Sequence, residues 1–201
     1  MAGVRLTPVI VILCSVFAGY QLLAGRPVHW SPGVLAPADP VQRDIDHAEP
    51  MTYKGVELMP RASFSAEVRV LSRERYRMGA LGTAVPLDFA VGWGPMSDSA
   101  VLADIKVTQG NRFYFWHYDE EPPIPRADIE AHSANWHLLP ATSQVFDTLD
   151  DVRVGEIVEL EGELVDIKGN DFTLRTSLTR KDTGAGACEV LYVQAVKRRY
   201  H

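Results

Sequence analysis

An alternating segment near the carboxyl end constrains the fold of this 201-residue chain more than any other feature. From Val154 to Ile167, apolar residues alternate with glutamates. Successive side chains of a strand point to opposite faces, so the pattern predicts a strand with one buried and one solvated face. The sequence at 168–171 predicts a hairpin turn, followed by a return strand at 172–176.

Other segments predict further strands with few helices between them. The predicted elements are a strand at Ala62–Leu71, a strand pair at Lys106–Tyr118 that turns at Gln109–Asn111, a buried run at Trp136–Pro140 and a closing strand at Val190–Val196. Short helices are expected from about Ala100, with Asp98 as the amino-terminal cap, and over Arg126–Asn135. The predicted fold class is therefore mainly β, an OB-like barrel or a small sandwich with one or two short helices.

The amino-terminal segment Leu6–Gly25 contains no charged residue and is bounded by Arg5 and Arg26. A helix of about 20 apolar residues spans the hydrocarbon core of a bilayer. The segment therefore predicts that residues 1–25 form a transmembrane helix or signal anchor. A cleaved signal peptide and a buried helix are the alternatives.

Residues 26–61 contain six prolines, which remove backbone donors and fix φ. We expect this segment to be an extended linker, or alternatively a docking segment for a membrane partner with Trp30 at the interface. Residues 62–201 would then form a β-rich domain. The slight bias of positive charge places this domain outside the membrane, so the expected location is the bacterial inner membrane, single-pass, with the domain in the periplasm or outside.

The charge balance bears on the partners. Of the 20 lysines and arginines, two precede Pro27, whereas none of the 26 acidic residues does, so the remainder of the chain carries a net charge of −8. Nucleic-acid affinity depends mainly on neutralising phosphates, so nucleic acid is not expected as a partner. The expected partners are the membrane, through the amino-terminal helix, and a protein or a small anionic ligand.

The loop Thr176–Glu189 combines glycines with several reactive side chains. Arg180 and Lys181, together with loop amides, are candidates for an anion or partner site. Asp182 belongs to the same candidate site; the alternative is that it stabilises the loop by bonding to the Gly184 N–H group. Cys188 ends the candidate group.

A second unusual stretch places Trp93 between Gly92 and Gly94. One hypothesis is that Trp93 lines a pocket with Asp88 or Asp98 at its mouth. The alternative is a core tryptophan whose indole N–H finds an acceptor.

Two kinds of chemistry are open to the polar residues. Cys188 is a candidate nucleophile with His117 or His137 as its base, or else a small buried hydrophobe. The histidines and acids between residues 117 and 137 lack the spacing of a zinc site, so no metal or other cofactor is predicted.

Three segments, Asp88–Asp98, Asn135–Pro140 and Thr176–Glu189, together resemble a group of uncharacterised bacterial membrane-anchored proteins with an OB-like or β-rich domain. The resemblance covers most of the chain after the proline-rich segment. It implies a membrane location and no known activity. Separately, Val154–Val165 is similar to the Gly-x-x-Val-x-Leu-x-Gly strand pairs of small bacterial OB-like barrels, a likeness of fold alone.

The leading functional hypothesis is a membrane-anchored extracytoplasmic binding or assembly module without catalytic activity. Its candidate contact residues are Arg180, Lys181, Asp182, Trp93, Asp98, His137 and Cys188. One alternative is a hydrolase that uses His137, Asp98 or Cys188; geometric proximity of these groups in a cleft would favour it. A second alternative is a nucleic-acid-binding barrel, which would need a basic face around Arg112.

Overall fold

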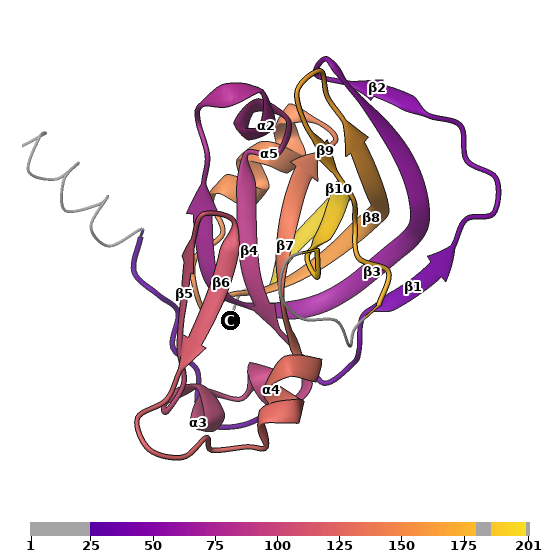
Figure 1. Cartoon of the computed structure of the whole chain (residues 1–201). Helices are drawn as coiled ribbons and strands as arrows, with labels where there is room; N and C mark the ends of the chain where they lie inside the picture. Colours follow the sequence, from indigo (N-terminus) through magenta and orange to yellow (C-terminus); the bar gives the residue numbers. More distant parts are fainter. Residues whose placement is uncertain (1–24, 180–185, 200–201) are drawn as a thin grey trace, which may run out of the picture.

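The computed structural model describes residues 25–179 and 186–199, which are mainly β with a few short helices (Figure 1). Five strands form a closed ring. In ring order they are β3 (Val56–Arg75), β4 (Leu87–Gly92), β7 (Ser133–Pro140), β10 (Glu189–Arg199) and β8 (Ile157–Lys168). The ring closes because β3 pairs with both β4 and β8. The β7–β10 pair is parallel and the other four pairs of the ring are antiparallel.

The alternation in β8 has the predicted consequence. Val158, Leu160 and Leu164 are fully buried in the main core, whereas Glu161 between them is exposed. Large rings complete this core, with Phe64 packed edge-on against Trp136 at 5.2 Å between ring centroids. Burial of apolar side chains from all five strands is the main stabilising contribution to the barrel.

The expectation that residues 26–61 lack regular structure is wrong. This segment contains β1 (Val41–Asp44) and β2 (Met51–Tyr53), which both pair with β3, and β3 itself begins at Val56. Pro60 is accommodated at a register shift between Pro60 and Ala62, where the loss of a ladder hydrogen bond is tolerated.

Residues before β1 also pack on the barrel. The Val28 amide donates to the Val154 carbonyl (2.8 Å), and the Trp30 indole N–H donates to the Gly155 carbonyl (2.8 Å). A side chain at Gly155 would meet the Val28 carbonyl oxygen at 2.1 Å, so glycine permits this close approach. The part of the predicted linker that the structure describes is therefore docked, and a boundary at residue 62 passes through β3.

The helices of the described residues are short. They are α2 (Gly79–Ala84), the 3₁₀ helix η1 (Gly94–Ser97), α3 (Ser99–Leu102), α4 (Arg126–Ala131) and α5 (Ser143–Asp150). Asp98 caps α3 as predicted, because its carboxylate accepts from the Ala100 amide (2.8 Å). Helix α4 ends at Ala131 rather than at residue 135, since β7 begins at Ser133 and pairs there with β4.

A strand pair outside the ring forms a second sheet. It consists of β5 (Lys106–Gly110) and β6 (Phe113–His117), as the sequence predicted. The turn lies at Asn111 and Arg112, whose φ angles are 53° and 66°, slightly later than expected. The short strand β9 (Thr173–Leu174) pairs with the end of β8 and confirms the predicted hairpin there.

Among residues 25–179 and 186–199, no helix is long and apolar enough to cross a membrane. The predicted anchor lies almost entirely in residues 1–24, outside the described part of the chain.

Candidate functional site

The loop Thr176–Glu189 begins and ends at neighbouring positions on the barrel. The Ser177 amide donates to the Cys188 carbonyl (3.0 Å), and the Val190 amide donates to the Thr176 hydroxyl (3.0 Å). These bonds place Cys188 directly before β10, at the base of the loop. Three candidates in the middle of the loop, Arg180, Lys181 and Asp182, lie outside the described residues.

Asp88 and His137 face each other on the two strands that lead away from Cys188 in the ring, β4 and β7. They are directly opposed in the β4–β7 pairing, and Asp88 Oδ1 lies 2.9 Å from His137 Nδ1. Leu87 and Phe89, the neighbours of Asp88 in β4, belong to the barrel core, so strand alternation turns Asp88 to the outer face. Both polar side chains are nonetheless buried, with relative exposures of 0% for Asp88 and 4% for His137.

His137 is paired with Val190 on β10, and Cys188 lies two residues before Val190. His137 also interacts with Cys188. Burial lowers the pKa of His137, but the interactions with Asp88 and Cys188 raise it by more, to about 9. The imidazole is therefore protonated at neutral pH. An imidazolium next to a thiol favours the thiolate, which is the nucleophilic form of cysteine.

Arg112 contacts the same carboxylate oxygen of Asp88 as His137 does. Its guanidinium pairs with Asp88 Oδ1 at 3.1 Å, donates to the Val85 carbonyl (3.0 Å) and lies 3.8 Å from the centre of the Tyr76 ring. Asp88 thus faces two cationic groups, Arg112 and protonated His137. Buried charges are costly unless they are paired, and here the Asp88 carboxylate is paired with both cations.

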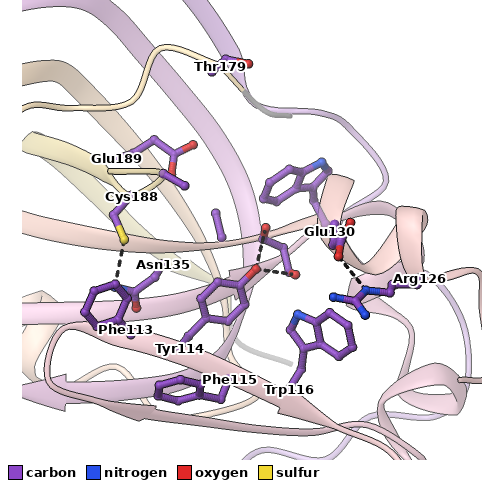
Figure 2. A pocket seen from close by; sticks show the side chains of 14 residues that line it. Phe113, Tyr114, Phe115, Trp116, Arg126, Glu130, Asn135, Thr179, Cys188 and Glu189 are labelled. Atoms are coloured by element: carbon purple, nitrogen blue, oxygen red, sulfur yellow. Dashed lines mark hydrogen bonds and ion pairs between the residues drawn. The ribbon is translucent and has the colours of Figure 1, made fainter. Parts of the chain in front are cut away.

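A pocket of about 280 Å³ opens in front of Cys188 (Figure 2). Its walls are formed by aromatic side chains of β6, by polar side chains of helix α4 and by the first residues of β7. Its lining residues are Trp93, Phe113, Tyr114, Phe115, Trp116, Arg126, Glu130, Ser133, Ala134, Asn135, Thr179, Ala187, Cys188 and Glu189. Asp88, His137 and Arg112 are not among the lining residues, so of this group of four side chains Cys188 alone lines the cavity.

Tyr114 supplies a hydroxyl to the same cavity. Its Oη lies 3.3 Å from the Ser133 carbonyl oxygen, to which it donates, and 3.2 Å from the Ser133 hydroxyl. Burial raises the pKa of Tyr114, the Ser133 contact lowers it in part, and the nearby Glu189 and Cys188 raise it further. The phenol therefore stays protonated and acts as a hydrogen-bond donor at neutral pH.

Polar groups also mark the end of the pocket away from Cys188. The Arg126 guanidinium donates to Glu130 (2.8 Å), and its central carbon lies 5.3 Å from the centre of the Trp116 ring. Figure 2 shows Tyr114 and Trp116 between this ion pair and the thiol. The cavity thus joins an apolar, aromatic middle to a reactive group at one end and a charged pair at the other.

The structure separates the remaining sequence candidates. Trp93 is a core residue, with 2% exposure and an indole N–H that donates to Asp39 (3.0 Å). It also lines the pocket, but neither Asp88 nor Asp98 is among the lining residues. Asp98 is not among the pocket residues; besides capping α3 it accepts from the Gly33 amide (2.8 Å). The carboxylate beside His137 is Asp88 instead.

His117 is the remaining histidine candidate. His117 lies on β6 and lines a separate surface cavity with the acidic stretch that follows it. Across residues 25–179 and 186–199, no group of three or more His, Cys, Asp or Glu side chains is arranged to hold a metal ion.

Comparisons of the chain with protein-family models, with curated proteins and with solved structures found no match. The site must therefore be interpreted from its own geometry.

The sequence signal for this site was incomplete. Cys188 with His137 as base was one of the hypotheses, and strand pairing places Cys188 two residues before Val190, the partner of His137. The contributions of Asp88 and Arg112 were not assigned, because they depend on strand pairing and on a turn that folds back over β4. An acidic residue within the buried run Leu87–Val91 was the available signal, since a buried charge requires a partner.

Proposed function

We propose that this protein is a cysteine-dependent acyl-transfer enzyme, a hydrolase or transferase, which acts on a small substrate held in the aromatic pocket. The observation that carries the proposal is the placement of Cys188 two residues before Val190, the strand partner of His137, together with the 2.9 Å distance between His137 Nδ1 and the buried carboxylate of Asp88. Nucleophile, base and orienting carboxylate in this order form the arrangement that activates a weak nucleophile.

The chemistry follows from these positions. The thiolate of Cys188 forms a bond to the carbonyl carbon of the substrate while His137 is protonated. The bond to the leaving group then breaks, and the leaving group takes the proton from His137. Water, or another acceptor, gives a proton to His137 and attacks the resulting thioester, whose bond to sulfur breaks and releases the thiolate. Asp88 stabilises the imidazolium by its negative charge.

The pocket lining indicates the class of substrate. Four consecutive aromatic residues, Phe113 to Trp116, and the ring of Trp93 present apolar surface, whereas Arg126 and Glu130 present charge at the far end. A carbonyl compound with an apolar or aromatic body and a polar end group fits this distribution. The volume of about 280 Å³ limits the bound part to a small molecule or a single side chain.

The arrangement of the barrel supports the same location for a binding site. The ring β3-β4-β7-β10-β8, with helix α5 between its third and fourth strands in chain order, resembles an OB-like barrel. In such barrels the second and third strands and the loop between the fourth and fifth strands carry the ligand. Here these elements are β4, β7 and the loop that ends at Cys188. This support is an analogy of fold and does not specify the chemistry.

A binding module without catalysis is the second candidate, and the aromatic walls of the pocket favour it. In that account Cys188 would be a lining residue and His137 a buried histidine paired with Asp88. The nucleic-acid alternative is less well supported, because Arg112 is only 17% exposed and is engaged by Asp88 and Tyr76.

We also retain the membrane location as part of the proposal. Its support is the uncharged segment Leu6–Gly25, together with the resemblance to membrane-anchored bacterial proteins. The domain would then act outside the cytoplasmic membrane.

Covalent trapping tests the function directly. The full chain, with Cys14→Ser to leave one cysteine, is incubated with a panel of p-nitrophenyl esters and acyl thioesters, and its mass is measured. We expect a mass increase equal to one acyl group, located on Cys188, and its loss in a Cys188→Ser variant. Hydrolysis that persists in Cys188→Ser, or no adduct with any compound, would leave the binding module as the better account.

A further inference from the structure

Asn135 is a residue of β7 that lies next to the Cys188 thiol and is almost fully buried, with 1% exposure. Its Nδ2 donates to the backbone carbonyl of Arg112 (3.0 Å) and lies 3.9 Å from Cys188 Sγ, towards which it also donates. Figure 2 shows this contact between the amide and the sulfur at the end of the pocket. The side chain therefore offers an N–H group at the position where the reacting atoms would meet.

The orientation of this amide is fixed by its neighbours. A backbone carbonyl only accepts hydrogen bonds, so the atom of Asn135 that faces the Arg112 carbonyl must be the nitrogen. The opposite atom, Oδ1, accepts from Gln109 Nε2 at 2.6 Å. Gln109 lies on β5 and Arg112 on the turn, so the hairpin β5–β6 holds both ends of the amide.

We propose that the Asn135 amide donates a hydrogen bond to the Cys188 thiolate and to the oxyanion formed on the substrate, and that Gln109 is the residue that positions it. This inference rests on the proposed function. A preorganised N–H next to developing negative charge stabilises the transition state of acyl transfer. Hydrogen bonds to the charged form of a group also lower its pKa, so the same contact makes the thiolate more accessible.

The charged groups around the thiol decide how much this contact matters. His137 on β7 favours a negative charge on Cys188. Glu130 and Glu189 line the same pocket and oppose that charge. Asn135, a neutral donor 3.9 Å from the sulfur, adds to the favourable side of this balance.

The deciding variant is Gln109→Leu, which removes the donor that orients Asn135 without changing the charge. Its alkylation by iodoacetamide is measured as a function of pH in the full chain with Cys14→Ser, with the modified Cys188 quantified by mass spectrometry. We expect the pH midpoint of alkylation to rise by roughly half a unit to one unit. The matched control is Gln144→Leu on the exposed surface of α5, which should leave the midpoint unchanged.

Gln109→Met provides an independent arm, because it keeps the length of the side chain and removes the donor without adding a charge. Asn135 Oδ1 then loses its hydrogen bond, and the midpoint should rise as in Gln109→Leu. If Gln109→Leu loses its near-ultraviolet circular dichroism, Gln109→Met decides the question. A midpoint equal to that of the parent chain would overturn the inference. A parent midpoint at the ordinary value of free cysteine would instead contradict the proposed function, so the two failures are distinguishable.

Discussion

The carboxylate of Asp88 and the imidazole of His137 lie 2.9 Å apart on directly opposed residues of β4 and β7. The pair is an ion pair and not a well-aligned hydrogen bond, since Nδ1 has no hydrogen-bond partner among the described residues. Both groups are buried, so their charges cannot be screened by water. The stability of the barrel and the reactivity of Cys188 therefore depend on the same protonation equilibrium.

The stability of the protein should decrease as the pH rises above neutrality. The pKa of His137 is raised to about 9 in the folded chain, against about 6.5 when unfolded. Protonation thus stabilises the fold fully below pH 6.5, and this contribution is lost as the pH rises through about 9. The shift corresponds to a decrease on the order of 3 kcal/mol in the free energy of unfolding. Urea denaturation between pH 6 and pH 9.5 measures it.

The same series with two variants identifies the group responsible. His137→Gln should show little pH dependence over this range, whereas His117→Gln, on the exposed face of β6, should keep the slope of the parent chain. An equal slope in His137→Gln would assign the dependence to another group.

Gly162→Ala should destabilise the barrel strongly. A methyl group at Gly162 on β8 would lie 2.0 Å from the Tyr192 carbonyl oxygen on β10, and backbone on both strands would have to move. We expect a loss of about 3 kcal/mol in the free energy of unfolding. Gly110→Ala is the matched control, because nothing lies within 4 Å of the added atom. Equal stability of the two variants in urea would contradict the strand packing described here.

The amino-terminal boundary of the folded domain should lie before residue 41. A fragment that begins at Arg26 keeps the docked segment, β1, β2 and all of β3, so it should fold and remain soluble. A fragment that begins at Ala62 loses the buried residues Tyr53 and Leu58, and it should lack cooperative unfolding in urea. Cooperative unfolding of the shorter fragment would restore the original interpretation of residues 26–61 as a spacer.

Periodicity in the sequence predicted the strands that carry the alternation, such as β8, the pair β5–β6 and the cap at Asp98. It failed where tertiary contacts decide. Prolines suggested a linker, yet Pro60 is tolerated at a register shift within β3, and Val28 and Trp30 dock through bonds to residues 154 and 155. No local pattern contains this information.

The candidate site was predicted only in part, because it too depends on tertiary contacts. Cys188 and His137 were recognised from residue type, and their contact was one hypothesis among several. Asp88, Arg112 and Asn135 join them only through the pairing of β4 with β7 and through the hairpin turn at residues 111–112. Asp98 has the same chemistry as Asp88 but lies at a helix cap, and sequence alone did not separate the two.

The central claim is that Asp88 and His137 make Cys188 a nucleophilic thiolate, and the pH dependence of Cys188 alkylation tests it most directly. The full chain with Cys14→Ser is alkylated with iodoacetamide between pH 5 and pH 10, alone and with Asp88→Asn or Asp98→Asn added. We predict a midpoint well below the ordinary cysteine value of about 8.5, an upward shift in Asp88→Asn, and no shift in Asp98→Asn. A midpoint at or above 8.5 that Asp88→Asn does not change would contradict the account.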